Sequence, residues 1–197
     1  MKVLGICGSP RSGGNSETLL DIALATARKN GAQTEKLVLN KLKISPCQEK
    51  EYEKMGEKGL SVVNDDMKIV FDAFEGANAI LIATPIFFGS VSGQTKIMVD
   101  RFHSVWLAKH VFKKEIFNSK KIGGFISVQA GDREDFFMNA RSIIRNLYAT
   151  LGIQYKYELF CPNVSGKHDV SAHKEYLDKA AEIGRALAGE EEGQKLA

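Results

Sequence analysis

Short apolar runs alternate with helical patterns along most of the chain, and this alternation limits the possible folds more than any other feature. Five apolar runs predict strands, over residues 2–7, 33–39, 78–83, 121–128 and 153–160. Apolar residues at helical spacing predict helices over residues 16–30, 67–74, 94–109, 135–151 and 171–188. Neighbouring parallel strands need a crossover connection, which is usually a helix. The sequence therefore predicts an α/β fold, a parallel sheet with helices on both faces.

The remaining segments set the expected domain organisation. At 197 residues one domain is expected, over residues 1–189. Residues 40–66 are polar and rich in Lys and Glu, which predicts a long insertion with about one helical turn. The acidic end, residues 190–197, is predicted to be a disordered tail.

Composition argues against several classes of protein. The net charge is +3 and the 27 basic residues are scattered, which does not favour a nucleic-acid partner. No apolar stretch reaches the roughly 20 residues that span a bilayer, and the first run is too short for a signal peptide. The three cysteines are far apart, so a disulfide framework is not expected. We predict a soluble cytoplasmic protein with neither a nucleic-acid nor a membrane partner.

Three loops rich in Gly, Ser and Pro directly follow predicted strands. They cover residues 8–15, 84–93 and 129–134. Because ligands of open α/β sheets bind beyond the carboxyl ends of the strands, these loops are the candidate site.

The first loop, GSPRSGGN, does not match the common phosphate chemistries. It has no lysine, which a Walker A loop requires. The glycines do not fit the dinucleotide fingerprint, and Asn40 stands where that motif has an acid. Three residues separate Cys7 from Arg11, whereas tyrosine phosphatases have five, so Cys7 is predicted to be a buried strand residue. The acidic residues of a response regulator are also missing after the first and third strands.

The same loop can hold a phosphate without attacking it. Hydroxyl and amide donors come from Ser9, Ser12, Asn15 and Ser16, and Arg11 adds a positive charge. The following helix supplies free backbone amides and a favourable dipole. The alternative is a tight turn with a Ser or Asn N-cap.

Two stretches, SPRSGGNSETLL and TPIFFGSVSGQTKIMVDR, carry a family resemblance. From Met1 to about residue 160 the chain resembles the NAD(P)H-dependent FMN reductase and iron–sulfur flavoprotein group of the flavodoxin-like superfamily. The resemblance implies a three-layer sandwich whose five parallel strands have the order 2-1-3-4-5. It also implies FMN as cofactor and NAD(P)H as co-substrate.

The resemblance assigns cofactor contacts to each loop. The FMN phosphate would lie on the first loop, at Ser9, Arg11, Ser12, Asn15 and Ser16. The isoalloxazine would lie along the second loop, at Pro85, Ile86, Phe87, Phe88, Gly89 and Ser90. The third loop would approach the other side of the ring, at Gln129, Ala130, Gly131 and Asp132. For Phe87 and Phe88 the alternative is packing in the core or between subunits.

The chain departs from the iron–sulfur flavoproteins in its insertion. Cys47 is the only cysteine there, whereas a [4Fe–4S] cluster needs about four thiolates, so no cluster is expected. No histidine or second cysteine lies near Cys47 to complete a zinc site, and the four histidines are not expected to be metal ligands.

The resulting hypothesis is an FMN-dependent oxidoreductase. Hydride would pass from nicotinamide to FMN and on to a quinone, a flavin or another small acceptor, with no catalytic side chain required. The resemblance further implies a homodimer or homotetramer. Three alternatives remain. The first is a flavodoxin-type electron carrier, which the pI of about 8.7 disfavours. The others are a flavin-free interaction module and an azo- or nitro-reductase, which differs only in its acceptor.

Overall fold

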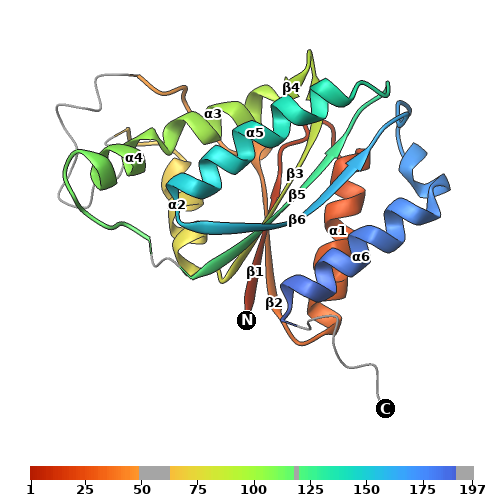
Figure 1. Cartoon of the computed structure of the whole chain (residues 1–197), viewed down its shortest axis with the longest axis horizontal. Coiled ribbons are helices and arrows are strands. Elements are labelled where there is room, and N and C mark those ends of the chain that lie inside the picture. Colours follow the sequence, from red (N-terminus) through yellow and green to blue (C-terminus); the bar gives the residue numbers. More distant parts are fainter. Residues whose placement is uncertain (49–62, 118–119, 190–197) are drawn as a thin grey trace.

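The computed structural model describes residues 1–48, 63–117 and 120–189. Its centre is a twisted parallel sheet (Figure 1). The parallel strands are β1 (Lys2–Cys7), β2 (Gln33–Val38), β3 (Ala79–Phe87), β5 (Lys121–Val128) and β6 (Ile153–Cys161). They follow the order β2-β1-β3-β5-β6, which is the predicted order when only the parallel strands are numbered. The predicted fold class is confirmed.

Helices cover both faces of the sheet (Figure 1). One face carries α1 (Asn15–Lys29) and α6 (Lys174–Leu187). The other carries α2 (Met67–Gly76), α3 (Gly93–Arg101), α4 (His103–His110) and α5 (Glu134–Thr150). None of the helices within the described ranges has the length and apolarity needed to cross a membrane.

The sheet separates two hydrophobic cores because successive side chains of a strand point to opposite faces. In β3, Leu81 packs with the α1 and α6 side chains, whereas Ile80 and Ile82 pack on the opposite face. Helices α1 and α6 approach closely at Gly184, where a Cβ atom would lie 2.1 Å from the Ala23 carbonyl oxygen. Only a glycine permits this contact.

Several element boundaries differ from those predicted, and the largest differences lie around the second loop and the helix that follows it. Strand β3 does not end at residue 83 but continues to Phe87 and pairs antiparallel with the short strand β4 (Ser90–Val91), which was not predicted. The helix predicted over residues 94–109 is two helices that meet at Phe102. The buried Phe102 ring packs 4.8 Å from the Phe74 ring, and this contact holds the junction against α2.

The last helix also begins later than predicted. Residues Asp169–Ala172 form a 3₁₀ helix, and α6 starts at Lys174. A 3₁₀ turn covers Leu39–Lys41, where the predicted insertion begins. The middle of the insertion and the predicted tail, residues 190–197, lie outside the described residues.

A buried ion pair fastens the insertion to α3. The Arg101 side chain is fully buried, and its Nη1 donates to Asp65 Oδ2 at 2.6 Å and to the Ser45 carbonyl at 2.9 Å. Asp65 also accepts hydrogen bonds from the backbone N–H groups of Ser45 and Met67. Burial alone would raise the pKa of Asp65, but Arg101 and these two N–H groups hold it below its ordinary value.

Candidate functional site

The three predicted loops lie at the carboxyl edge of the sheet, the upper edge in Figure 1. Each follows a parallel strand: β1, β3 and β5. The fold therefore brings together segments that are more than 100 residues apart in sequence, as the sequence predicted.

The first loop is a tight turn that leads directly into α1. Ser9 Oγ accepts a hydrogen bond from the Arg11 N–H at 3.1 Å and lies 3.0 Å from the Arg11 carbonyl, to which it donates. Gly13 has a φ of 66°, which a glycine adopts without strain. The helix N-cap is Gly14, so the alternative of a Ser or Asn cap is wrong. Among the described residues no side chain caps this helix end, which leaves its first amides available to an anion.

The five predicted phosphate-binding residues differ in their surroundings. Arg11 and Ser12 are exposed, whereas Ser9 and Ser16 are buried. Asn15 lies between these extremes, and its carboxamide joins α1 to the segment after β6. Its Nδ2 donates to the Gly166 carbonyl at 2.7 Å, and its Oδ1 accepts from the Val170 N–H at 3.2 Å.

Cys7, at the end of β1, is fully buried. Burial raises the pKa of the Cys7 thiol to about 11. The side chain is therefore a neutral thiol near pH 7 and an apolar part of the core, which confirms the prediction that Cys7 is a buried strand residue.

A carboxylate beneath the first loop was missed by the sequence reasoning. Glu17 Oε2 accepts a hydrogen bond from the Gly13 N–H at 2.7 Å, and Oε1 lies 3.0 Å from Lys36 Nζ. Burial alone would raise the pKa of Glu17, but the bonds from Lys36 and Gly13 lower it. A Glu at the third helical position often reaches back in this way, which is the signal that could have identified it. Lys36 Nζ also lies 2.7 Å from Asp21 Oδ1, so the two carboxylates share one ammonium group.

A buried hydroxyl network joins the first and second loops, and its members were not predicted either. Ser92 Oγ donates to the Gly8 carbonyl at 2.6 Å and lies 2.9 Å from Thr95 Oγ1. Thr95 Oγ1 in turn donates to Thr84 Oγ1 at 3.1 Å. All three hydroxyl side chains are fully buried. A Cβ atom on Gly8 would lie 2.0 Å from Thr95 Oγ1, so only a glycine fits there.

The second loop is a β-hairpin rather than an irregular loop. Ile86 pairs with Val91 and Phe87 pairs with Ser90, so the turn consists of Phe88 and Gly89 alone. Both turn residues have positive φ, 50° and 73°, the signs of a type I′ turn. Phe88 is fully exposed, and Phe87 is 40% exposed. Pro85 is half-buried and Ile86 is buried.

The third loop is held by its backbone and by one buried side chain. The Gln129 N–H donates to the Cys161 carbonyl at 3.0 Å, and Gln129 Nε2 donates to the Arg133 carbonyl at 3.0 Å. Ala130, Gly131 and Asp132 are exposed at the tip of this loop. A Cβ atom on Gly131 would find no heavy atom within 4 Å, so the space beside it is open.

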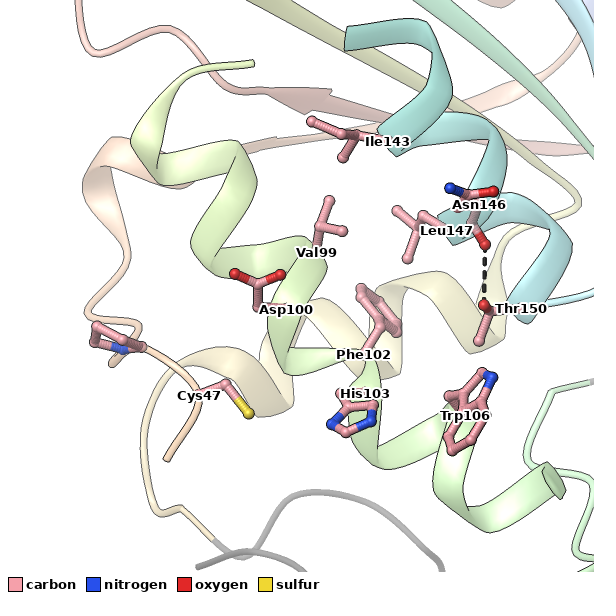
Figure 2. Close-up of a pocket in the computed structure, with 11 residues that line it drawn as sticks. Cys47, Val99, Asp100, Phe102, His103, Trp106, Ile143, Asn146, Leu147 and Thr150 are labelled. Carbon is pink, nitrogen blue, oxygen red and sulfur yellow. Dashed lines mark hydrogen bonds between the residues drawn. The ribbon is translucent and has the colours of Figure 1, made fainter. Parts of the chain in front are cut away.

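A pocket also lies away from these loops, between α3, α4 and α5 (Figure 2). Its volume is about 530 Å³. Figure 2 shows Val99, Phe102 and Trp106 facing Ile143 and Leu147 of α5 across it, with Cys47 at one side. None of the predicted cofactor-binding residues lines this pocket. Within the described ranges, no three His, Cys, Asp or Glu side chains are grouped closely enough to hold a metal ion.

Known proteins resemble this chain in sequence and in fold. An iron–sulfur flavoprotein of Methanosarcina thermophila is 31% identical over 128 residues, which is 65% of this chain and 63% of that protein. The chain therefore spans less than two thirds of that relative's length. The structure of an NAD(P)H:quinone oxidoreductase from Methanothermobacter marburgensis superposes with a TM-score of 0.72 at 16% identity, covering 95% of this chain and 98% of that one.

A second structural neighbour was solved with a ligand bound. It is an FMN-dependent NADH-azoreductase from Bacillus anthracis in complex with FMN, with a TM-score of 0.70 at 14% identity, covering 96% of this chain and all of that one. At such low identity these two neighbours support the fold alone. The model of the family described as NADPH-dependent FMN reductase matches residues 1–153, which include all three loops. The chain therefore belongs to the NADPH-dependent FMN reductase family.

Proposed function

We propose that this chain binds FMN at the carboxyl edge of its sheet and acts as an FMN-dependent NAD(P)H oxidoreductase. Family membership supports the cofactor and the class of reaction. The observation that carries the proposal is the uncapped N-terminus of α1 beneath a Gly-rich loop, at the edge where α/β sheets bind their ligands. FMN has a terminal phosphate monoester, which is the group such a helix end accepts.

The residues of the first loop fit this phosphate. Ser9, Ser12 and Ser16 provide hydroxyl groups, and Asn15 holds the neighbouring 166–170 segment in place. Arg11 provides an exposed cation that can turn toward the anion. The carboxylate of Glu17 lies beneath the loop, where the Gly13 N–H occupies Oε2 and Lys36, which Glu17 shares with Asp21, offsets part of its negative charge.

The second and third loops would enclose the flat part of the cofactor. We propose contacts from Pro85, Ile86, Phe87, Gly89 and Ser90 on the hairpin, and from Gly131 on the third loop. The ring of Phe88, at the exposed tip of the hairpin, would lie beside the bound cofactor rather than on it. Gly131 leaves open space beside its backbone, and the hairpin offers apolar surface through Phe87. Bound FMN would supply the redox chemistry, accepting hydride from NAD(P)H and passing it to a quinone, a flavin or another small acceptor.

The protein's own contribution is binding, orientation and charge. No side chain is assigned a catalytic role. A net charge of +3 disfavours the flavodoxin-type electron carrier, whose relatives use an acidic surface to dock on basic partners. We further propose a cytoplasmic homodimer or homotetramer, as the family resemblance implies.

A visible spectrum of the purified protein tests the proposal first. We expect flavin absorption bands that bleach on anaerobic addition of NADPH and return when a quinone is added. A colourless protein that takes up no added FMN would refute cofactor binding. A flavin that is retained but not reduced by NADPH would instead favour the electron carrier.

A charge substitution then tests the position of the phosphate. Arg11→Ala should weaken FMN binding about tenfold, because it removes a charge-assisted hydrogen bond. Lys29→Ala is the matched control, since Lys29 is an exposed cation at the other end of α1 and should change the dissociation constant less than about twofold. Equal effects of the two substitutions would mean that only overall charge matters.

A further inference from the structure

The tip of the β3–β4 hairpin carries an aromatic residue where the backbone does not favour one. Phe88 is the first residue of a two-residue type I′ turn and has a φ of 50°. Asn-Gly or Gly-Gly is the usual sequence in such turns, and a bulky residue with positive φ is strained. The second turn residue, Gly89, does follow the preference.

Hydrophobic burial does not explain the choice of Phe either. The relative exposure of Phe88 is 108%, so its ring makes almost no contact within the chain. The strained backbone lowers the stability of the fold, and no packing contact of the exposed ring offsets this cost. Backbone strain of this kind is found mainly where a residue has a functional role.

The hairpin holds the backbone of Phe88 in a fixed position. Ile86 and Val91 pair with each other, and both are buried. On the other side of the turn, a Cβ atom on Gly89 would lie 3.0 Å from the Phe136 ring, so the turn rests on α5. The Arg133 guanidinium covers Phe136, at 4.3 Å from the ring centroid. The turn that carries Phe88 follows β3, which lies between β1 and β5 in the sheet, so this turn stands between the first and third loops.

We propose that Phe88 is a specificity residue. Its ring forms the outer wall of the place where the electron acceptor lies against the flavin, and it favours flat conjugated rings, such as quinones, over non-planar acceptors. This inference rests on the proposed function and refines it by naming the substrate class. In the reaction a quinone gains two electrons and two protons, as a hydride from reduced FMN and a proton from solvent. The quinone becomes a hydroquinone, and the flavin is reoxidised.

The test compares two acceptors in the oxidative half-reaction alone. FMN-loaded protein is reduced anaerobically with dithionite and mixed in a stopped-flow instrument with a naphthoquinone or with two equivalents of ferricyanide. Ferricyanide is octahedral and cannot stack on an aromatic ring. Phe88→Asn should slow the quinone reaction roughly three- to tenfold, the range of one lost aromatic stacking contact, and leave the ferricyanide rate within about twofold.

Two further variants serve as controls. Phe88→Trp keeps an aromatic ring at the turn and should retain most of the quinone rate. Phe112→Asn removes another exposed ring, 49% exposed and located after α4 away from the loops, and should change neither rate. If Phe112→Asn slowed the quinone reaction as much as Phe88→Asn, the effect would not be specific to the hairpin and the proposal would be wrong.

Measurements without turnover separate the proposal from its competitors. Because Asn suits the turn, Phe88→Asn should raise the melting temperature of the apo-protein by about 2–6 °C. It should leave the dissociation constant of FMN and the molar mass in solution unchanged. A weaker affinity for FMN, or equal slowing with both acceptors, would place the ring on the cofactor and overturn the proposal.

A change in molar mass would also overturn it, by assigning Phe88 to a subunit contact. Failure of the proposed function gives a different result. In that case wild-type protein takes up no FMN, so no half-reaction can be recorded, while the melting temperature still reports the strain at the turn. A loaded, reducible wild type in which Phe88→Asn leaves the quinone rate unchanged would refute the specificity role alone.

Discussion

Charged side chains that are buried in the described part of this protein have hydrogen-bond partners. Asp65 and Arg101 show this most clearly, because the ion pair between them is almost completely removed from solvent. Two further backbone N–H groups complete the hydrogen bonding of the carboxylate. Removing the charge from one partner of such a pair leaves the other buried and uncompensated, which costs more than the pair contributes.

We therefore expect Asp65→Asn to lower the free energy of unfolding by about 3 kcal/mol. The variant amide would place an NH₂ group where wild-type Oδ2 accepts hydrogen bonds from Arg101 and Ser45. Urea denaturation near pH 7 measures the loss. Asp72→Asn is the control, because Asp72 pairs with Lys68 on the surface and should contribute less than about 1 kcal/mol.

The same pair predicts a pH dependence. The pKa of Asp65 is lower in the folded chain than in the unfolded one, where it is about 3.9. Its stabilising effect is therefore complete above that value and is lost as the pH falls through the folded pKa. The difference in stability between wild type and Asp65→Asn should shrink below about pH 4. A difference that stayed constant down to pH 2 would show that Asp65 contributes by shape rather than by charge.

At the scale of whole elements, the sequence predicted the strands and helices well. It did not predict the β3–β4 hairpin or the hydrogen bonds that connect the first loop with the second. Apolar runs identify the central strands β1, β3 and β5 because these are covered on both faces of the sheet. The hairpin was predicted as an irregular loop, since its Gly and Ser residues are typical turn formers and β4 has only two residues. The hydroxyl network could not be predicted, because it depends on how close Gly8 lies to Thr84 and Thr95 in the folded chain.

That network leads to a prediction about stability. Thr95→Val keeps the shape of the side chain but removes the hydroxyl that contacts both Ser92 and Thr84. Because the remaining hydroxyl groups stay buried, the unfolding free energy should fall by about 2 kcal/mol. Thr150→Val is the control, since its hydroxyl donates only to Asn146 of the same helix and should matter by less than about 0.5 kcal/mol. Equal losses of unfolding free energy in the two variants would mean that the buried network contributes no more than one hydrogen bond within a helix.

At the scale of the whole molecule, the carboxyl edge of the sheet brings loops that are far apart in sequence together on one surface. The first and second loops share the buried hydroxyl groups, and the second loop rests through Gly89 on Phe136 of α5, the helix that follows the third loop. The sequence could identify this edge because parallel strands all end there. It could not indicate that Phe88 is exposed at the tip of a tight turn, since this depends on backbone geometry that composition does not determine. The position of Glu17 at the third residue of α1 was a signal for its bond to the loop.

A ligand that joins all three loops should stabilise the entire fold. Saturation at 100 times the dissociation constant adds about 2.7 kcal/mol, which for a chain of this size is a rise of about 5–10 °C in melting temperature. We expect FMN added to the stripped protein to produce this rise. Riboflavin at the same concentration has the ring but no phosphate, so it cannot use the N-terminus of α1 and should produce a much smaller one. Equal shifts for the two ligands would mean that the first loop does not hold the phosphate, and the location of the site would have to be revised.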